Sequence, residues 1–139
     1  MSIFQIESDI TITCHKRIAP YLEAEIKDLG YHIKHSFVTG VTIQGTLNDC
    51  IHINLNVRCA SQVLFSLGQF EANHPDDIYN NLIDIAWEDL LHKDGYFSVT
   101  SNVQHPTINN SMYVNLKVKD AIVDCFASLF NIRPKTGSE

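Results

Sequence analysis

The chain has 139 residues, 45% of them hydrophobic, and a formal net charge of −6. This length suits one domain, or two small ones that share a core. The hydrophobic content excludes a disordered chain. The negative charge excludes a protein that grips nucleic acid by charge alone, because Lys and Arg supply most non-specific affinity for phosphate. Uncharged stretches are interrupted by Asn, Ser, Thr or Gln, and no basic segment opens the chain. We therefore expect a cytoplasmic protein with no membrane partner.

The first third of the chain predicts a strand, a helix and a hairpin. Residues 10–14 alternate between apolar and polar side chains, which is typical of a short strand. Pro20 lies in the first turn of a predicted helix that ends at Leu29. Residues 31–38 and 41–45 then predict two strands joined by a tight turn. The resulting order is strand, helix, strand, strand.

A second helix and a further strand are predicted next. Thr46 and Asp49 have the spacing of a capping box, which opens a helix that ends near Arg58. Residues 62–70 are apolar and rich in branched side chains, which favours a strand.

The following segment predicts another helix and another strand. Pro75 begins a helix that ends near Leu91, with Ile78 on its inward face. Residues 97–103 alternate cleanly and predict a strand that ends before Pro106. The chain as a whole therefore belongs to the α+β class, with interlocked layers.

The longest helical pattern runs from Ser111 to Asn131 and contains no Gly or Pro. At ~100° per residue it carries two apolar stripes on roughly opposite sides. The first stripe holds Val114, Val118, Ala121, Ile122, Cys125 and Leu129, and the second holds Met112, Leu116, Val123 and Phe130. A helix of this kind needs cover on both sides, and the predicted strands do not supply enough. We therefore expect the second stripe to stay exposed or to mediate self-association.

Two lysines of this helix have different environments in the projection. Lys117 lies in the narrow polar arc, three residues before Asp120, which predicts an ion pair between them. Lys119 lies between the apolar stripes. Its stem is predicted to be buried, with its ammonium group held by an acceptor.

The sequence contains no pattern typical of a catalytic, metal or cofactor site. Its six glycines include no G-x-G, and its seven histidines include no H-E-x-x-H. The four cysteines form no C-x-x-C and are predicted to be free thiols of a reducing compartment. Cys14-His15 and Cys50-x-His52 each offer only two zinc ligands, which make no site. The carboxylates of Asp120 and Asp124 are predicted to form a solvated face.

Three segments resemble a known family. These are residues 57–91, the strand FSVTSNV, and residues 108–134, in which KVKDAIVD and the closing Arg133-Pro134 are the most specific. They resemble a THUMP domain, and more closely the N-terminal region of bacterial ribosomal RNA large-subunit guanine-N2 methyltransferases. The resemblance implies a ferredoxin-like subdomain in residues 1–45 packed on a THUMP α/β domain in residues 46–139. The THUMP domain is expected to be incomplete at its C-terminal end.

The resemblance implies an RNA-binding module. It would present structured RNA, specifically large-subunit rRNA and not DNA, to an S-adenosylmethionine-dependent methyltransferase domain of the same polypeptide. The chain alone is expected to hold no cofactor and to be inactive. An alternative is a stand-alone THUMP-type adaptor for a separate RNA-modifying enzyme. A third hypothesis is a ferredoxin-like interaction domain with no role on RNA.

Positions that match the family's pattern imply the RNA-facing residues. These are Arg58, Asn110, Ser111, Lys117, Arg133 and, as a neighbour, Lys135. Gln62 and Asn109 stand where the family often has Arg, and each removes a phosphate contact. Structural roles remain open as well. Arg58 could stabilise a helix C-terminus, Asn110 and Ser111 could only cap a helix, and Arg133 could tie the last helix to the sheet.

Overall fold

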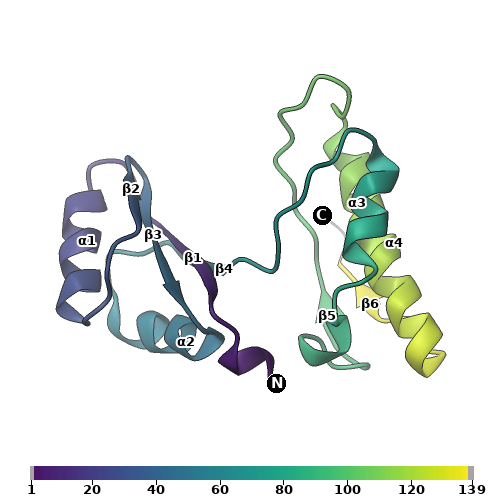
Figure 1. Ribbon diagram of the computed structural model, residues 1–139, viewed down its shortest axis with the longest axis horizontal. Coiled ribbons are helices and arrows are strands. Elements are labelled where there is room, and N and C mark those ends of the chain that lie inside the picture. The colour runs from purple at the N-terminus through teal and green to yellow at the C-terminus, as the bar shows by residue number, and fades with distance from the viewer. Residues whose placement is uncertain (1, 138–139) are drawn as a thin grey trace. The chain divides into compact units, whose positions relative to one another are not determined.

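The computed structural model describes residues 2–137 and forms two compact units, one ending at Gln69 and the other beginning at Phe70 (Figure 1). Each unit contains its own cluster of buried apolar side chains. No helix in this described range is long and apolar enough to cross a membrane.

The first unit is a four-stranded antiparallel sheet with two helices. Its elements are η1 (Ile3–Gln5), β1 (Ser8–Thr13), α1 (Ala19–Asp28), β2 (His35–Phe37), β3 (Gly40–Gly45), α2 (Leu47–Asn56) and β4 (Gln62–Phe65). The strand order is β2-β3-β1-β4, and every neighbouring pair is antiparallel. This is the order of a ferredoxin-like fold, and it confirms the predicted strand, helix, strand, strand sequence.

Local signals determine both helices of this unit. Pro20 lies in the first turn of α1, where its missing N–H costs no helical hydrogen bond. The predicted capping box of α2 is present: Thr46 N donates to Asp49 Oδ2 at 2.7 Å, and Asp49 N donates to Thr46 Oγ1 at 3.4 Å. Asp49 also accepts from the Tyr31 hydroxyl at 2.9 Å, which connects the cap to the chain after α1.

The core of the first unit follows from strand alternation. Ile10 and Ile12 of β1 are fully buried, and they pack in one cluster with Leu22 and Ile26 of α1 and Ile53 of α2. The same period places polar β1 side chains on the opposite face of the sheet.

The predicted division after residue 45 falls inside this first unit. β4 pairs with β1 along residues 62–65, and α2 packs against β4. Both elements are therefore integral to the ferredoxin-like sheet. A ferredoxin-like fold requires both elements, because its second helix and its fourth strand complete the sheet.

The second unit contains two helices and a short parallel ladder. Its elements are α3 (Pro75–Leu82), η2 (Trp87–Asp89), β5 (Tyr96–Phe97), α4 (Ser111–Phe130) and β6 (Lys135–Thr136). α3 lies along α4 (Figure 1). The prediction that α3 continues to Leu91 is wrong. The Trp87 indole N–H donates to the Leu82 carbonyl at 2.8 Å, in place of a further helical turn.

Three predicted strands are shorter in the structure, and the first of them, predicted over residues 31–38, is limited to β2 (His35–Phe37). β4 ends at Phe65 and β5 at Phe97, whereas the sequence predicts strands over residues 62–70 and 97–103. Phe97 is buried, and Val99 and Val103 are half-buried between exposed neighbours, so the alternation itself is retained. A strand also needs a partner for its N–H and C=O groups. Within the described chain, β6 pairs with only the first two residues of that segment.

The predicted long helix is confirmed as α4. Asn110 caps it by accepting from Tyr113 N at 3.2 Å, and Asn131 ends it in the left-handed conformation at φ 52°. Phe126 is fully buried with Trp87 and Phe97. In the second stripe Val123 is buried, whereas Met112, Leu116 and Phe130 are 76%, 51% and 44% exposed. The predicted exposure of that stripe is therefore confirmed except at Val123.

Candidate nucleic-acid interface

Charge is distributed unevenly between the two units. Residues 1–69 contain five basic and six acidic side chains, whereas residues 70–139 contain five basic and ten acidic ones. A surface that binds nucleic acid in the second unit must therefore keep its cations apart from its carboxylates.

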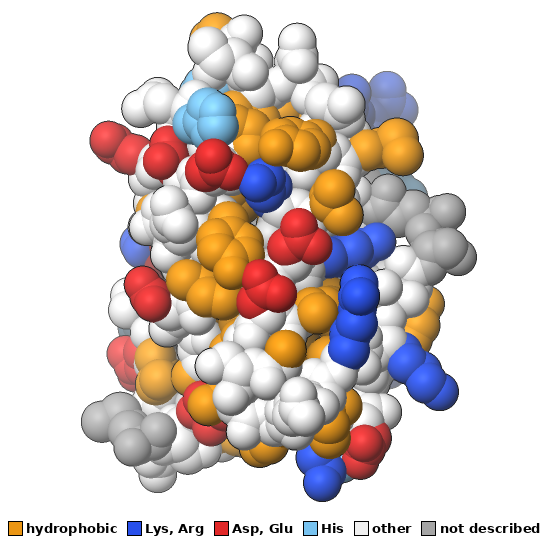
Figure 2. All heavy atoms as spheres, turned by 90° about the vertical axis from the view of Figure 1, so that its right-hand side faces the viewer, with side chains coloured by type: hydrophobic (Ala, Val, Ile, Leu, Met, Phe, Trp, Pro, Cys, Tyr) orange, Lys and Arg blue, Asp and Glu red, His pale blue; other side chains and the backbone are white. Residues whose placement is uncertain are grey.

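Four cations of the second unit gather around β6. Lys93, Arg133 and Lys135 line one hollow of about 270 Å³, together with Asp94. Lys119 Nζ donates to the carbonyl of Gly137 at 3.2 Å, two residues beyond Lys135. We refer to Lys93, Lys119, Arg133 and Lys135 as the basic cluster. In Figure 2, most Lys and Arg side chains of this face lie on its right, with an acidic side chain among them at the lower right, and most acidic side chains lie at its centre and left.

The parallel ladder brings these cations together from distant parts of the chain. Tyr96 pairs with Lys135, and Phe97 with Thr136. The turn before β5 is closed by Gly95 N, which donates to the His92 carbonyl at 2.8 Å. This turn places the segment containing Lys93 next to the end of α4.

Lys119 occupies the environment that the sequence predicts. Its side chain is half-buried, and the Gly137 carbonyl is the acceptor for its ammonium group. The contact also directs Lys119 towards β6. A structural role and membership of the basic cluster are therefore compatible.

Lys117 does not pair with Asp120, so that prediction is wrong. Its Nζ lies 2.7 Å from Asp76 Oδ1 on α3 and 5.5 Å from the centre of the Tyr113 ring. The hydrogen bond to Asp76 raises the pKa of Lys117, and the same bond lowers the pKa of Asp76. α3 covers the polar arc of α4, which supplies a partner that periodicity within one helix could not reveal.

One carboxylate of the polar arc, that of Asp124, is likewise engaged by α3. The Tyr79 hydroxyl donates to Asp124 Oδ2 at 2.7 Å, and this hydrogen bond raises the pKa of Tyr79. Asp120 is half-buried in the same arc. α3 thus contacts the arc through Lys117 and Asp124, and the predicted solvated face is retained at Asp124, which stays exposed.

The remaining predicted contact residues lie in structured positions. Arg58 belongs to the first unit and lies just beyond α2. Its side chain is exposed, and its backbone N–H donates to Glu25 Oε2 at 3.0 Å. Asn110 caps α4, and the Ser111 carbonyl accepts from Ser101 Oγ at 3.2 Å. Asn110 and Ser111 therefore have the capping and helix-end roles that the sequence allows, and both remain exposed.

Lys93 is a member of the basic cluster that sequence reasoning missed. It stands in a polar turn, where a lysine is unremarkable in the sequence. Its proximity to Arg133 exists only because residues 96–97 pair with residues 135–136. A lysine immediately before a predicted strand was the one available signal, and it is a weak one.

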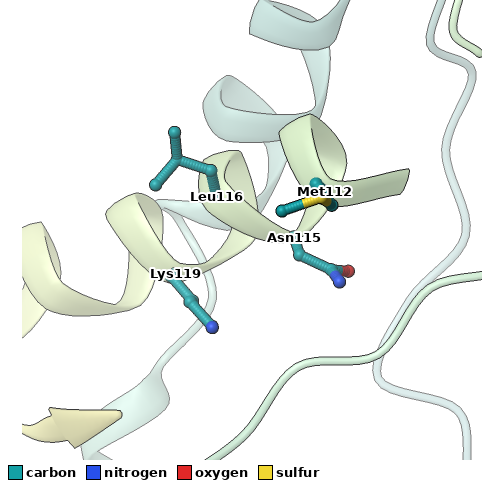
Figure 3. A pocket seen from close by; sticks show the side chains of 4 residues that line it. All are labelled: Met112, Asn115, Leu116 and Lys119. Atoms are coloured by element: carbon teal, nitrogen blue, oxygen red, sulfur yellow. The ribbon is translucent and has the colours of Figure 1, made fainter. Parts of the chain in front are cut away.

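A shallow hollow on α4 borders the basic cluster. It encloses about 220 Å³ and is lined by Met112, Asn115, Leu116 and Lys119. Figure 3 shows these side chains leaving neighbouring turns of the helix, with Asn115 and Lys119 directed to the same side. Lys119 thus belongs to both surfaces.

The described residues do not fit a nucleotide-type methyl donor. No two glycines form the G-x-G turn that lets a backbone approach such a cofactor. Between residues 2 and 137 the parallel strands are limited to the two-residue β5–β6 pair, whereas cofactor crevices of open α/β sheets form at the ends of longer parallel strands.

Comparison with known proteins identifies both units. A family model for the RlmL ferredoxin-like domain matches residues 9–64, and one for the THUMP domain matches residues 72–136. Ribosomal RNA large subunit methyltransferase K/L of Syntrophotalea carbinolica is 33% identical over 127 residues, which are 91% of this chain and 18% of that protein. The protein of the same name from Psychromonas ingrahamii is 36% identical over 119 residues, 86% of this chain and 16% of that protein.

Solved structures share the fold. A possible methylase from Clostridium difficile superposes with a TM-score of 0.73 at 22% identity, over 96% of this chain and 36% of that one. SMU.472, complexed with SAH, gives a TM-score of 0.80 at 19% identity, over 96% of this chain and 37% of that one. The chain spans less than a fifth of the curated relatives named above. It consists of an RlmL ferredoxin-like domain followed by a THUMP domain.

Proposed function

We propose that this chain is the RNA-binding module of an S-adenosylmethionine-dependent ribosomal RNA (guanine-N2) methyltransferase. In this role it positions structured large-subunit rRNA for a catalytic domain elsewhere in the same polypeptide. The observation that carries the proposal is the tandem of the two domains, which matches proteins called ribosomal RNA large subunit methyltransferase K/L.

The basic cluster supports a binding role. It offers four cations on one surface of a unit that is otherwise acidic. Arg133 and Lys135, which the family resemblance implies as RNA-facing, both belong to it. RNA would approach this surface and be repelled from the carboxylate-rich side, so the charge distribution would orient the ligand. Arg58, Asn110 and Ser111 stay predicted contacts, and Lys117 would have to leave Asp76 to become one.

Titration of a structured large-subunit rRNA fragment against the chain tests the proposal. Four phosphate contacts predict a log–log salt slope of about −3 to −4, at roughly 0.7–0.9 per contact. The double variant Arg133→Gln/Lys135→Gln should reduce the slope by about 1.4–1.8. Lys16→Gln/Arg17→Gln, in the first unit, is the charge-matched control and should retain most of the affinity. Tight binding that is insensitive to salt would contradict the proposal.

A second measurement tests whether this chain alone transfers a methyl group. Incubation of the chain with S-adenosylmethionine and unmodified rRNA should yield no methylated RNA, because the described residues do not fit the cofactor. Methylated product from the purified chain would place catalysis within these residues and overturn that part of the proposal.

A further inference from the structure

An exposed aromatic ring stands beside Lys135 of the basic cluster. Tyr96 is 67% exposed, although its neighbour Phe97 is buried in the core of the second unit. Tyr96 and Lys135 are paired in the parallel ladder, so their side chains leave the same face of it. Since Phe97 points to the core, this face is the outer one.

The hydroxyl end of the ring contacts a glycine. A Cβ atom at Gly137 would collide with the Tyr96 hydroxyl oxygen and lie 2.9 Å from its Cζ, so the hydroxyl end of the ring rests against the Gly137 backbone. Gly137 is itself anchored, because its N–H donates to the Phe97 carbonyl at 2.9 Å and its carbonyl accepts from Lys119. One end of the ring is therefore in contact with an anchored backbone segment, while most of its surface faces solvent.

An exposed ring beside a lysine of the basic cluster fits one ligand chemistry. Proteins that bind single-stranded nucleic acid combine aromatic side chains, on which bases stack, with a basic groove for the backbone. A base within an RNA duplex cannot use such a ring, because both of its faces are already stacked. An unpaired nucleotide offers a free base face next to its phosphates.

We propose that Tyr96 stacks on an unpaired base of the RNA while Lys93, Arg133 and Lys135 bind the phosphates beside it. The basic cluster thereby selects a loop, bulge or single-stranded end within a structured RNA. This inference rests on the proposed function, which it extends from RNA in general to an unpaired nucleotide.

The test uses the chain and a single-stranded oligoribonucleotide that contains 2-aminopurine, with the same strand in a duplex as comparison. The single strand should bind more tightly, with quenching of the 2-aminopurine fluorescence. Tyr96→Leu should weaken binding about 5- to 150-fold and abolish the quenching, with no change in the salt slope. Lys135→Gln should lower the slope by about 0.7 and preserve the quenching.

Two controls separate stacking from a structural role. Tyr96→Phe retains the ring and should bind and quench as the wild type does. Thermal unfolding of Tyr96→Leu, followed by Trp87 fluorescence, shows whether the second unit remains folded. If that variant unfolds, the test of stacking rests on whether the wild type and Tyr96→Phe both quench the 2-aminopurine fluorescence.

The outcomes distinguish this inference from the proposed function. Equal binding by the wild type and a folded Tyr96→Leu, or equal binding of duplex and single strand without quenching, would overturn the stacking role only. Failure of the wild-type chain to bind either probe or a structured rRNA fragment would overturn the proposed function together with it.

Discussion

The two units differ in how completely each covers its own apolar surface. Of the eight largest side chains that are fully buried in the described structure, seven belong to the first unit and only Phe126 to the second. The first unit encloses its residues between a four-stranded sheet and two helices. The second sets one long helix against α3, a two-residue ladder and irregular segments. A regular sheet with two helices thus encloses a fully buried core, whereas one long helix with short neighbouring elements leaves part of its apolar surface exposed.

The largest expected difference between the units comes from their buried side chains. Phe126→Ala should lower the free energy of unfolding of the second unit by about 3–5 kcal/mol, because it leaves a cavity beneath Trp87 and Phe97. Trp87 is the single tryptophan of the chain, so its fluorescence during urea unfolding reports on this unit alone.

Ile12→Ala is the matched change in the first unit. It should cost about 2–5 kcal/mol there and leave the Trp87 transition in place, because the two clusters share no residue. A shift of the Trp87 transition as large as that of the circular-dichroism transition would show that the units unfold together and would remove the contrast.

Alkaline pH should weaken the first unit. Burial, reinforced by the hydrogen bond to Asp49, raises the pKa of Tyr31 to about 12. The pKa of a tyrosine in an unfolded chain is about 10. Because the folded pKa is the higher one, the stabilisation by this hydroxyl is fully present below pH ~10 and is lost as the pH rises towards about 12. We therefore expect the free energy of unfolding of the first unit to decline over this pH range.

Tyr31→Phe should reduce that decline and cost about 0.5–1.5 kcal/mol at pH 8, the typical net value of one hydrogen bond. Tyr21→Phe is the control, since Tyr21 belongs to the same unit and is exposed on α1. An unchanged alkaline decline in Tyr31→Phe would assign the effect to other groups.

A smaller effect separates the two lysines of α4. Lys119→Met should reduce the salt slope of RNA binding by about 0.7–0.9, since Lys119 belongs to the basic cluster. Lys117→Met should leave the slope nearly unchanged, because its ammonium group is already paired with Asp76. The family resemblance implies the reverse assignment, with Lys117 on the RNA. The two salt titrations therefore decide between the structure's pairing and the family pattern.

The smallest effect on stability concerns the second stripe of α4. Leu116→Gln should change the free energy of unfolding by less than about 0.5 kcal/mol, as is usual for an exposed site. Val123→Ala, in the same stripe but buried, should cost more than about 1 kcal/mol.

Self-association provides a second measurement on that stripe. We expect the wild-type chain to associate at high concentration through the exposed Met112 and Leu116, and Leu116→Gln to sediment as a monomer. Identical sedimentation of both proteins as monomers at all concentrations would contradict this.

Features fixed by neighbouring residues could be predicted from the sequence. The capping box at Thr46, the start of α1 at Pro20 and the limits of α4 depend on side chains within one helical turn, and all three are present. The two stripes of α4 were recognisable for the same reason. Even the buried-stem environment of Lys119 followed from its place between them.

Features that depend on tertiary pairing could not be predicted in this way. Residues 97–103 have the alternation of a strand, but a ladder requires a partner, which exists here for two residues. Lys117 finds Asp76 only because α3 covers the polar arc. Lys93 meets Arg133 only through the pairing of β5 with β6. Two residues of the candidate interface, Arg133 and Lys135, could therefore be predicted from the sequence. The rest of the interface depends on the tertiary fold.

The segment that begins at the last residue of β5 has a consequence for the behaviour of the chain in concentrated solution. FSVTSNV, residues 97–103, contains no charged residue and no proline, and it is rich in β-favouring side chains. Short windows of this composition on an unpaired edge are templates for cross-β stacking, in which copies of one chain add to each other as strands. We therefore expect aggregation to begin at these seven residues, with the overall charge of −6 affecting mainly its rate.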